Sequence, residues 1–202
     1  MVFTHQYAPG AIDPRTSFCL YHSRDTDNMD INTVNALTYE EFLEIFGNVV
    51  EKCPIIPAAI WAHRPFKSFS DIEAQISEFI DSLPESGKEG ILRCHPDLSL
   101  PAVNLTRDSV DEQRAAGLVS MSSGERALLL DLCARYRQRF GFPFVICARA
   151  NSTETIGRAL RDRVNGERAQ ERDRGIEEVK KICSLRMRQI LQPTAEHSTN
   201  KL

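Results

Sequence analysis

One histidine in this sequence has surroundings suited to acid–base chemistry. His95 lies in the stretch Arg-Cys-His-Pro-Asp-Leu-Ser-Leu, residues 93–100, and Pro96 restricts the backbone before it to extended angles, which gives the imidazole a definite direction. Its near-neutral titration suits proton transfer. A turn at the end of a helix explains the same residues without catalysis. The other histidines are expected in the terminal segments or on the surface: His5, His22, His63 and His197.

A second candidate group is Ser109-Val110-Asp111-Glu112-Gln113. The Ser-x-x-Glu spacing is typical of a capping box, in which the glutamate side chain satisfies a backbone N–H group at a helix start. A helix N-terminus also presents free N–H groups and the positive end of the helix dipole, which bind a carboxylate or a developing oxyanion. The sequence predicts a helix start here and leaves both roles open.

A third group is Phe-Gly-Phe-Pro-Phe-Val-Ile-Cys-Ala, residues 140–148. This stretch is either a short strand or a buried extended segment, and periodicity does not decide between them. Because aromatic side chains flank it, the segment could line a flat apolar slot.

The elements that would position these groups are helices. Apolar residues recur at helical spacing in five stretches, which are 38–53, 70–83, 122–141, 152–165 and 167–192. Thr38 with Glu41 and Ser70 with Glu73 are the expected capping boxes. Shorter helices are expected at 91–95, at 109–118 and within 55–66, where Pro57 and Pro65 interrupt the pattern, and 84–90 is expected to be a loop.

At most one strand is indicated, so the predicted fold is all-α: a compact single-domain helical bundle with a long C-terminal helix. This domain is expected to span residues 29–192. Residues 1–28 contain two prolines and no apolar periodicity, which predicts a disordered extension. Residues 193–202 are expected to form a flexible tail after Pro193.

Composition excludes several classes of function. A net charge of −3 over 202 residues gives no general reason to expect nucleic acid as a partner, and no apolar run approaches the roughly 20 residues that span a bilayer. The arginines of 158–188 alternate with acidic residues, which is typical of a solvated, ion-paired helix face. The cysteines form no Cys-x-x-Cys pair, which argues against a zinc or thioredoxin-type site, and three are expected in the core: Cys133, Cys147 and Cys183.

Four motifs in order carry a resemblance to a known family. They are His-Pro-Asp-Leu (95–98), Ser-x-x-Glu-Gln-x-x-Ala-Gly-Leu (109–118), Tyr-x-x-Arg-Phe-Gly-Phe-Pro-Phe-Val-Ile-Cys-Ala-Arg (136–149) and Ile-Glu-Glu-Val-Lys-Lys-Ile-Cys-Ser-Leu-Arg (176–186). From about Met29 to Leu191 the chain resembles the 2-oxo-4-hydroxy-4-carboxy-5-ureidoimidazoline (OHCU) decarboxylases of urate degradation. It departs from the family pattern at Ser99-Leu100, in the shorter loop that follows, and at 121–126, which affects the expected pocket rim.

The resemblance implies an all-α homodimer, without metal or organic cofactor, that decarboxylates OHCU and reprotonates it on one face to give (S)-allantoin. By motif position it implies that His95 is the catalytic acid, that Pro96 contacts the substrate, and that Glu112 lies close to the reacting carbon. It also implies substrate contacts from Ser109, Val110, Asp111 and Gln113, backbone contacts from Phe144, Val145, Ile146, Cys147 and Ala148, and a functional Arg186.

These residue types fit the reaction. Loss of carbon dioxide leaves an electron pair on carbon, which an adjacent ring carbonyl could accept as an enolate-like oxyanion, and N–H groups aimed at that oxygen would stabilise it by roughly 3 kcal/mol each. Arg186 could bind the anionic substrate bidentately. Glu112 would accept hydrogen bonds from the substrate or repel its carboxylate.

Two other functions remain open, and the last three residues suggest a targeting signal. A thiol-dependent hydrolase would use Cys94 beside His95, and a non-catalytic interaction module would keep only the helical fold. The chain ends in Asn200-Lys201-Leu202, a variant of the Ser-Lys-Leu peroxisomal signal that an import receptor reads. A peroxisomal location is therefore expected, and a cytoplasmic one otherwise.

Overall fold

The computed structural model describes residues 29–98 and 105–191, and within these ranges all regular secondary structure is helical. This confirms the all-α prediction. The elements in chain order are α2 (Ile31–Ala36), α3 (Tyr39–Phe46), α4 (Ile55–Ile60), η2 (Trp61–His63), α5 (Phe69–Ser82), α6 (Glu85–Cys94), α7 (Arg107–Ala115), η4 (Leu118–Ser120), α8 (Ser123–Phe140), η5 (Ala148–Ala150), α9 (Thr153–Arg163) and α10 (Arg168–Leu191).

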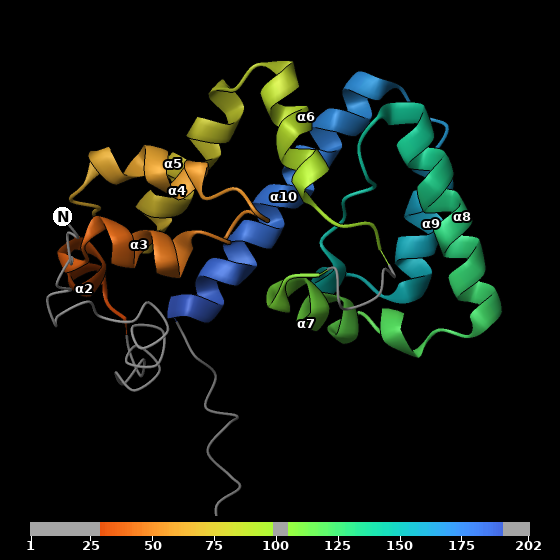
Figure 1. Cartoon of the computed structure of the whole chain (residues 1–202), viewed down its shortest axis with the longest axis horizontal. Helices are drawn as coiled ribbons and strands as arrows, with labels where there is room; N and C mark the ends of the chain where they lie inside the picture. The colour runs from red at the N-terminus through yellow and green to blue at the C-terminus, as the bar shows by residue number, and fades with distance from the viewer. Residues whose placement is uncertain (1–28, 99–104, 192–202) are drawn as a thin grey trace, which may run out of the picture.

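Helix α10 forms the central support of the bundle. It is 24 residues long, which confirms the long C-terminal helix, and it crosses the molecule between the α2–α5 group on one side and α8 and α9 on the other (Figure 1). Its main partners are α6 and α5. Glu171 on α10 also bonds Tyr136 of α8 and Arg163 of α9, so α10 contacts both groups and can bring residues from the two halves into one site.

Gly175 allows α10 and α6 to pack closely. A Cβ at this position would come within 2.8 Å of Leu92 Cδ2, which is closer than real Cβ contacts, so a larger residue would push the two helices apart or displace Leu92. Helix α6 ends at Cys94. The close packing therefore fixes the position of His95, the next residue, relative to α10.

The core contains two groups of aromatic side chains. One, around Phe42, joins Phe46, Trp61 and Phe66; the other, around Tyr136, joins Phe140, Phe142 and Phe144. Burial of each large apolar side chain stabilises the fold by about 1.5–3 kcal/mol. The second group includes Phe140, Phe142 and Phe144 of the 140–148 segment, of which residues 143–147 form neither helix nor strand.

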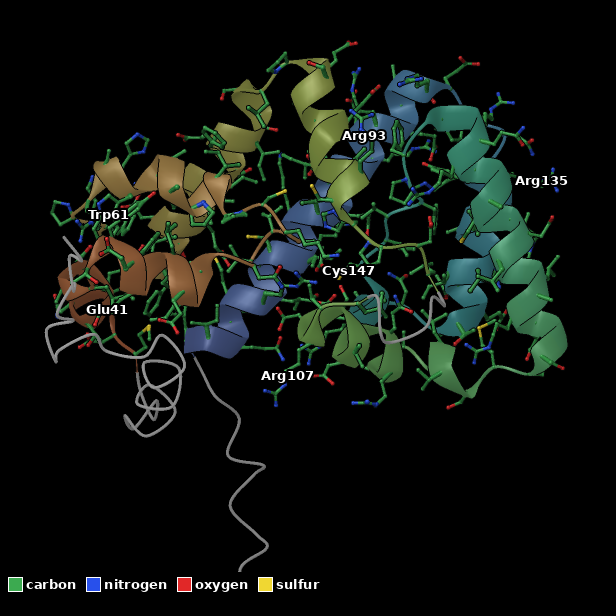
Figure 2. All side chains as sticks on the ribbon, viewed as in Figure 1. Glu41, Trp61, Arg93, Arg107, Arg135 and Cys147 are labelled. Atoms are coloured by element: carbon green, nitrogen blue, oxygen red, sulfur yellow. The ribbon has the colours of Figure 1, made fainter. Side chains whose placement is uncertain are left out.

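Burial agrees with most of the sequence pattern. The three cysteines expected in the core are buried, and Figure 2 shows Cys147 in the interior while Arg107 and Arg135 project outward. Leu128, whose apolar side chain in the predicted helical stretch 122–141 suggests an inward position, is instead 54% exposed. Gly141 ends that helix in the left-handed conformation, φ 78°, as expected.

Several helix boundaries differ from the sequence prediction. Helix α3 ends at Gly47 rather than continuing to Pro54, because residues 47–53 form turns. Helix α5 is capped by Ser68, whose side chain accepts from the N–H of Asp71, and not by Ser70. Residues 85–90 begin α6 instead of forming a loop, because Pro84 suits the position before a first helical turn. Pro57 lies within the first turn of α4, where it interrupts nothing.

Helix α7 also begins earlier than its sequence suggests. Its N-cap is Thr106, whose side-chain oxygen accepts from the N–H of Ser109 at 3.3 Å. Ser109 and Glu112 are therefore inside the helix and three residues apart, so their side chains lie on one face. The capping-box interpretation of Ser109 and Glu112 is wrong, and both side chains are available for other contacts.

No helix in the described ranges is long and apolar enough to cross a bilayer. Residues 1–28 and 192–202 lie outside the described residues, so the disordered extension and the flexible tail stay predictions.

Candidate active site

A pocket lies where α6, α7, α10 and the 142–148 segment meet. The space among its lining atoms, open solvent included, is about 370 Å³. Ten of the residues predicted from sequence line it: His95, Pro96, Ser109, Glu112, Gln113, Phe144, Val145, Ile146, Ala148 and Arg186. Leu98 and Ile182, which sequence reasoning missed, complete the wall.

His95 occupies the end of α6 with its ring almost fully buried. Its backbone is extended, φ −77° and ψ 142°, as the following proline requires. The ring Nδ1 lies 3.0 Å from the carbonyl oxygen of Ile91. Because a carbonyl only accepts, the proton must be on Nδ1. The other nitrogen, Nε2, is buried and has no hydrogen-bond partner among the described residues.

Burial, with a smaller contribution from the nearby Arg186 charge, lowers the pKa of His95 to about 4, against the opposing effects of Ile91 and Glu51. The imidazole is therefore neutral at pH 7, and its unprotonated Nε2 has a lone pair. The expected catalytic acid is a base in the free protein, because desolvation disfavours the imidazolium form. Any proton that it donates must first be accepted there.

Arg186 lies in the site but is already paired. Its Nε donates to Glu112 Oε1 at 2.7 Å and its Nη2 to Glu112 Oε2 at 2.9 Å, so the two-pronged face of the guanidinium contacts a protein carboxylate. The bidentate clamp expected for the substrate is thus occupied by Glu112. Although burial acts to lower the pKa of Arg186, hydrogen bonds and charge from Glu112 and Glu51 raise it above its usual value.

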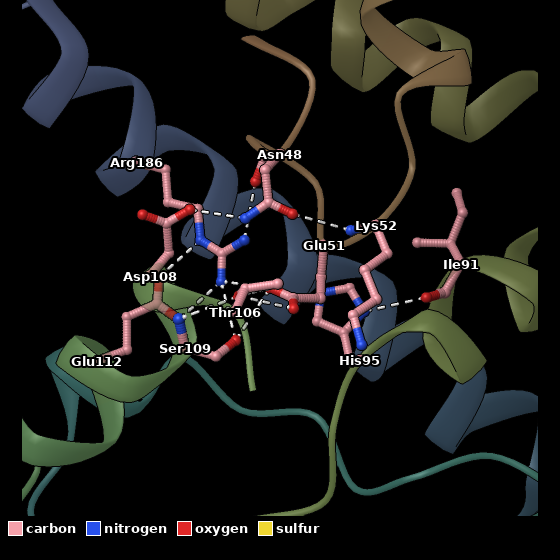
Figure 3. Close-up of polar contacts among 10 residues, drawn as sticks. All are labelled: Asn48, Glu51, Lys52, Ile91, His95, Thr106, Asp108, Ser109, Glu112 and Arg186. Carbon is pink, nitrogen blue, oxygen red and sulfur yellow. Dashed lines mark hydrogen bonds and ion pairs between the residues drawn. The ribbon is translucent and has the colours of Figure 1, made fainter. Parts of the chain in front are cut away.

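A second carboxylate, from Glu51, shares the same guanidinium. Its Oε2 lies 2.8 Å from Arg186 Nη2 and accepts from the hydroxyl of Ser109 at 2.9 Å, while Thr106 Oγ1 donates to Oε1 at 2.8 Å. Figure 3 shows these contacts converging on the guanidinium. Glu51 was missed because its segment, 47–53, reads as the end of the helix predicted over 38–53.

Three predicted contact residues do not reach the pocket. Val110 and Asp111 face away from it on α7, where Asp111 pairs with Arg114 on the surface at 2.8 Å, because a helix directs consecutive residues to different faces. Cys147 packs behind the wall, and its N–H donates to Glu178 at 2.8 Å, so it is not free for a substrate. The main-chain N–H groups of Ile146 and Ala148 form no hydrogen bond to other described residues.

Charges in the site do not balance. Glu51 and Glu112 contribute two negative charges, Arg186 one positive charge, and His95 none, which leaves a net charge of −1 in a buried cluster. The arginine series of 158–188, expected to be solvated, thus includes the buried Arg186. An uncompensated buried charge costs several kcal/mol, so such an arrangement is typical of a functional site rather than a stabilising one.

The geometry of the pocket does not support a thiol-dependent hydrolase. Cys94 is absent from the pocket lining. Burial raises the pKa of Cys147 and raises that of Cys183 to about 12, which keeps both as unreactive thiols. Within the described ranges, no three His, Cys, Asp or Glu side chains are grouped as a metal site requires.

Comparison with known proteins shows which family the chain resembles. The sequence pattern of the OHCU decarboxylase family matches residues 35–188. The chain is 54% identical to the OHCU decarboxylase of Amia calva, over 84% of this chain and 99% of that protein, and 48% identical to the Xenopus laevis enzyme, over 79% and 93%.

Solved structures share the fold at low sequence identity. A crystal structure of OHCU decarboxylase in the presence of (S)-allantoin has a TM-score of 0.60 at 17% identity and covers 77% of this chain and 99% of that one. One of (S)-allantoin synthase has a TM-score of 0.67 at 20% identity, over 81% of this chain and 54% of that one. With the motif order, the helical fold and these matches in agreement, the chain belongs to the OHCU decarboxylase family.

Proposed function

We propose that this protein decarboxylates OHCU to (S)-allantoin in urate degradation, without a cofactor, in the pocket beside His95. The observation that carries the proposal is the lone pair of His95 Nε2, buried and unpartnered at the pocket wall. A buried nitrogen without a partner is costly, so this position is built to receive a hydrogen from a ligand.

The substrate's structure defines what the site must do. Its name places a hydroxyl and a carboxylate on C4 and a ureido group on C5, and the ring double bond joins C5 to a ring nitrogen. When the bond to the carboxylate breaks, its electron pair forms a C4=C5 double bond, and the C5=N pair moves to that nitrogen, which takes a proton from the medium. The product then needs the C4 hydroxyl proton removed and a proton added at C5.

His95 can perform both transfers. Nε2 accepts the C4 hydroxyl proton while neutral, and the imidazolium so formed donates that proton to C5 as C4 becomes a carbonyl. One base on one side of the ring delivers the proton to one face, which fixes the configuration at C5. The Nδ1 contact with Ile91 at 3.0 Å holds the ring in place during both steps. Positioned acid–base catalysis of this kind contributes about 10²–10⁴ in rate.

The charged cluster opposes the substrate's carboxylate and favours its departure. Glu112 lines the pocket as a carboxylate paired with Arg186, and the cluster has a net charge of −1. A substrate carboxylate next to this charge is destabilised, and its loss as neutral carbon dioxide relieves the repulsion. Glu112 can also accept hydrogen bonds from the ureido N–H groups, which would orient the ring.

Freshly generated OHCU tests the proposal directly. Adding the protein should accelerate decarboxylation and yield (S)-allantoin, followed as a circular dichroism signal of the product. Decay at the spontaneous rate, or a racemic product, would refute it and leave a non-catalytic helical module as the better description.

We further propose that the protein is a homodimer. The support is the exposure of two apolar side chains, Val119 in η4 at 52% and Leu128 in α8 at 54%, because exposed apolar side chains that gather into a patch commonly mark protein interfaces. Light scattering should give twice the chain mass of 22.8 kDa, and Leu128→Glu should shift it toward the monomer. A monomeric wild type at all concentrations would contradict this proposal.

A peroxisomal location is our third proposal. Its support is the terminal Asn200-Lys201-Leu202, which an import receptor would read. The intact chain, tagged at its N-terminus, should accumulate in peroxisomes. The same tagged chain without its last three residues should spread through the cytoplasm. Identical images of both forms would exclude the signal.

A further inference from the structure

We propose that Glu51 is a positioning residue of this active site, which holds the Arg186 guanidinium so that Glu112 is presented to the pocket. The inference rests on the proposed function. Glu51 does not line the pocket and would not touch the substrate. Its carboxylate acts through the residues that do.

The position of Glu51 depends on a tight turn between α3 and α4. The Asn48 side chain accepts from the N–H of Lys52 at 3.0 Å, and Lys52 adopts a left-handed backbone, φ 51°, which is uncommon for a residue other than glycine. Helix α3 ends at Gly47, and the turn directs Glu51 inward, where it is 0% exposed.

The same turn contacts the guanidinium through two separate groups. The carbonyl oxygen of Asn48 accepts from Arg186 Nη1 at 2.8 Å, and Glu51 Oε2 lies 2.8 Å from Nη2. Glu112 bonds Nε and Nη2 from the pocket side. Two contacts from a fixed turn therefore set the plane of the guanidinium (Figure 3), and that plane sets the orientation of the Glu112 carboxylate.

Glu51 is itself anchored from α7. The Thr106 hydroxyl donates to it at 2.8 Å and the Ser109 hydroxyl at 2.9 Å. Thr106 also caps α7, so the start of the helix that carries Glu112 and the turn that carries Glu51 are fixed to each other. A group with three donors and no solvent contact has a definite orientation.

A purely stabilising role does not explain this choice of residue. Arg186 is already paired by Glu112, and a second buried carboxylate on one guanidinium adds an uncompensated charge. Buried ion pairs are commonly replaced by apolar residues at no loss of stability. Placement of a carboxylate and a guanidinium in a catalytic pocket, in contrast, depends on such supporting contacts.

The experiment compares Glu51→Gln with Glu171→Gln, a matched control. Glu171 is also 0% exposed and also pairs with arginines, but its partners Tyr136, Arg163 and Arg174 do not line the pocket, whereas the Glu51 partners Arg186 and Ser109 do. For E51Q we expect kcat to fall about tenfold or more with KM changed by less than about threefold, since the substrate contacts remain. For E171Q we expect a lower melting temperature and a kcat within about threefold of wild type.

The pH dependence of kcat/KM distinguishes a positioning role from a purely structural one. The charges that act on His95 are Glu51 from the turn, which raises its pKa, and Arg186 from α10, which lowers it. Removing the Glu51 charge should therefore shift the acidic limb of kcat/KM to lower pH. E171Q should leave the limb where it is.

The outcomes separate this inference from the proposed function. If wild type fails to turn over OHCU, the proposed function fails. If wild type is active and E51Q keeps its kcat, or if E171Q loses as much activity as E51Q, the positioning role is overturned. Should E51Q not fold, Thr106→Val and Thr106→Ser replace it. The valine lacks the hydroxyl that donates to Glu51, whereas the serine keeps it, so kcat should be lower for the valine variant than for the serine variant. Equal kcat values for the two variants would overturn the inference.

Discussion

Helix α10 carries two buried ion clusters that look alike and differ in what they leave unpaired. Near its start, Glu171 accepts from Tyr136, Arg163 and Arg174 at 2.8, 2.7 and 3.0 Å. Near its end, Arg186 pairs with two glutamates beside the pocket. Each cluster joins α10 to distant parts of the chain.

The first cluster has one carboxylate for two arginines, and the second has two carboxylates for one. In the first, the Glu171 carboxylate is bonded on both oxygens, and Arg163 also donates to the Val145 carbonyl and lies over the Phe144 ring. Arg163 Nη2 is buried without a hydrogen-bond partner among the described residues, but Arg163 does not line the pocket. The second has one carboxylate in excess, and its Glu112 and Arg186 line a cavity together with His95, whose Nε2 has no hydrogen-bond partner among the described residues. Burial and ion pairing alone do not identify a functional site. An uncompensated charge and a polar atom without a hydrogen-bond partner, both beside a cavity, do identify one.

Replacing arginine by lysine should produce the largest difference in activity between the two clusters. Arg186→Lys keeps the charge but cannot serve Glu112 and Glu51 in their present geometry, so kcat/KM should fall about 100-fold, or roughly 3 kcal/mol in transition-state stabilisation. Arg163→Lys should lower the melting temperature and reduce kcat/KM less than about tenfold. Steady-state kinetics and thermal unfolding of both variants check this. Equal losses of activity would remove the distinction between the clusters.

Acid should act on the site cluster through His95. The unfolded pKa is near 6.5 and the folded pKa is about 4, so between these values the unfolded chain binds a proton that the folded chain does not. Folding stability should therefore fall as pH drops from 6.5 toward 4, by about 3 kcal/mol from this one group. Urea unfolding at several pH values measures it, and His95→Asn should reduce the slope. An unchanged slope would mean that the folded imidazole titrates normally.

A smaller effect is expected in the first cluster. Tyr136→Phe removes a buried hydroxyl that donates to Glu171 at 2.8 Å, and hydrogen bonds to charged groups contribute about 1.5–3 kcal/mol. The melting temperature should fall while kcat stays near that of wild type, because neither residue lines the pocket. A loss of turnover without a loss of stability would show that the two clusters are coupled.

Sequence reasoning identified most of the fold because most of its signals are local. Apolar spacing located the long helices α8, α9 and α10, and Pro96 with Gly141 marked two helix ends. Helix starts were less certain, since Ser70 and Ser109 resemble caps as well as Ser68 and Thr106 do. Which serine or threonine caps a helix depends on the backbone that precedes it.

The site residues divide in the same way. Motif order placed His95, Glu112 and Arg186 together, and the structure brings all three to one pocket. No local signal could show that Glu112 occupies the guanidinium, that Glu51 shares it, or that His95 is neutral. These facts depend on burial and on contacts between residues up to 138 positions apart, which only the folded chain provides.

The central claim is that His95 moves the proton that sets the product's configuration. The most direct measurement is the rate and optical activity of allantoin formed from OHCU by His95→Asn, a variant that keeps a polar side chain of similar size. We predict decarboxylation no faster than the spontaneous reaction, a racemic product and an unchanged helical circular dichroism spectrum. Near-normal turnover to (S)-allantoin by this variant would contradict the account.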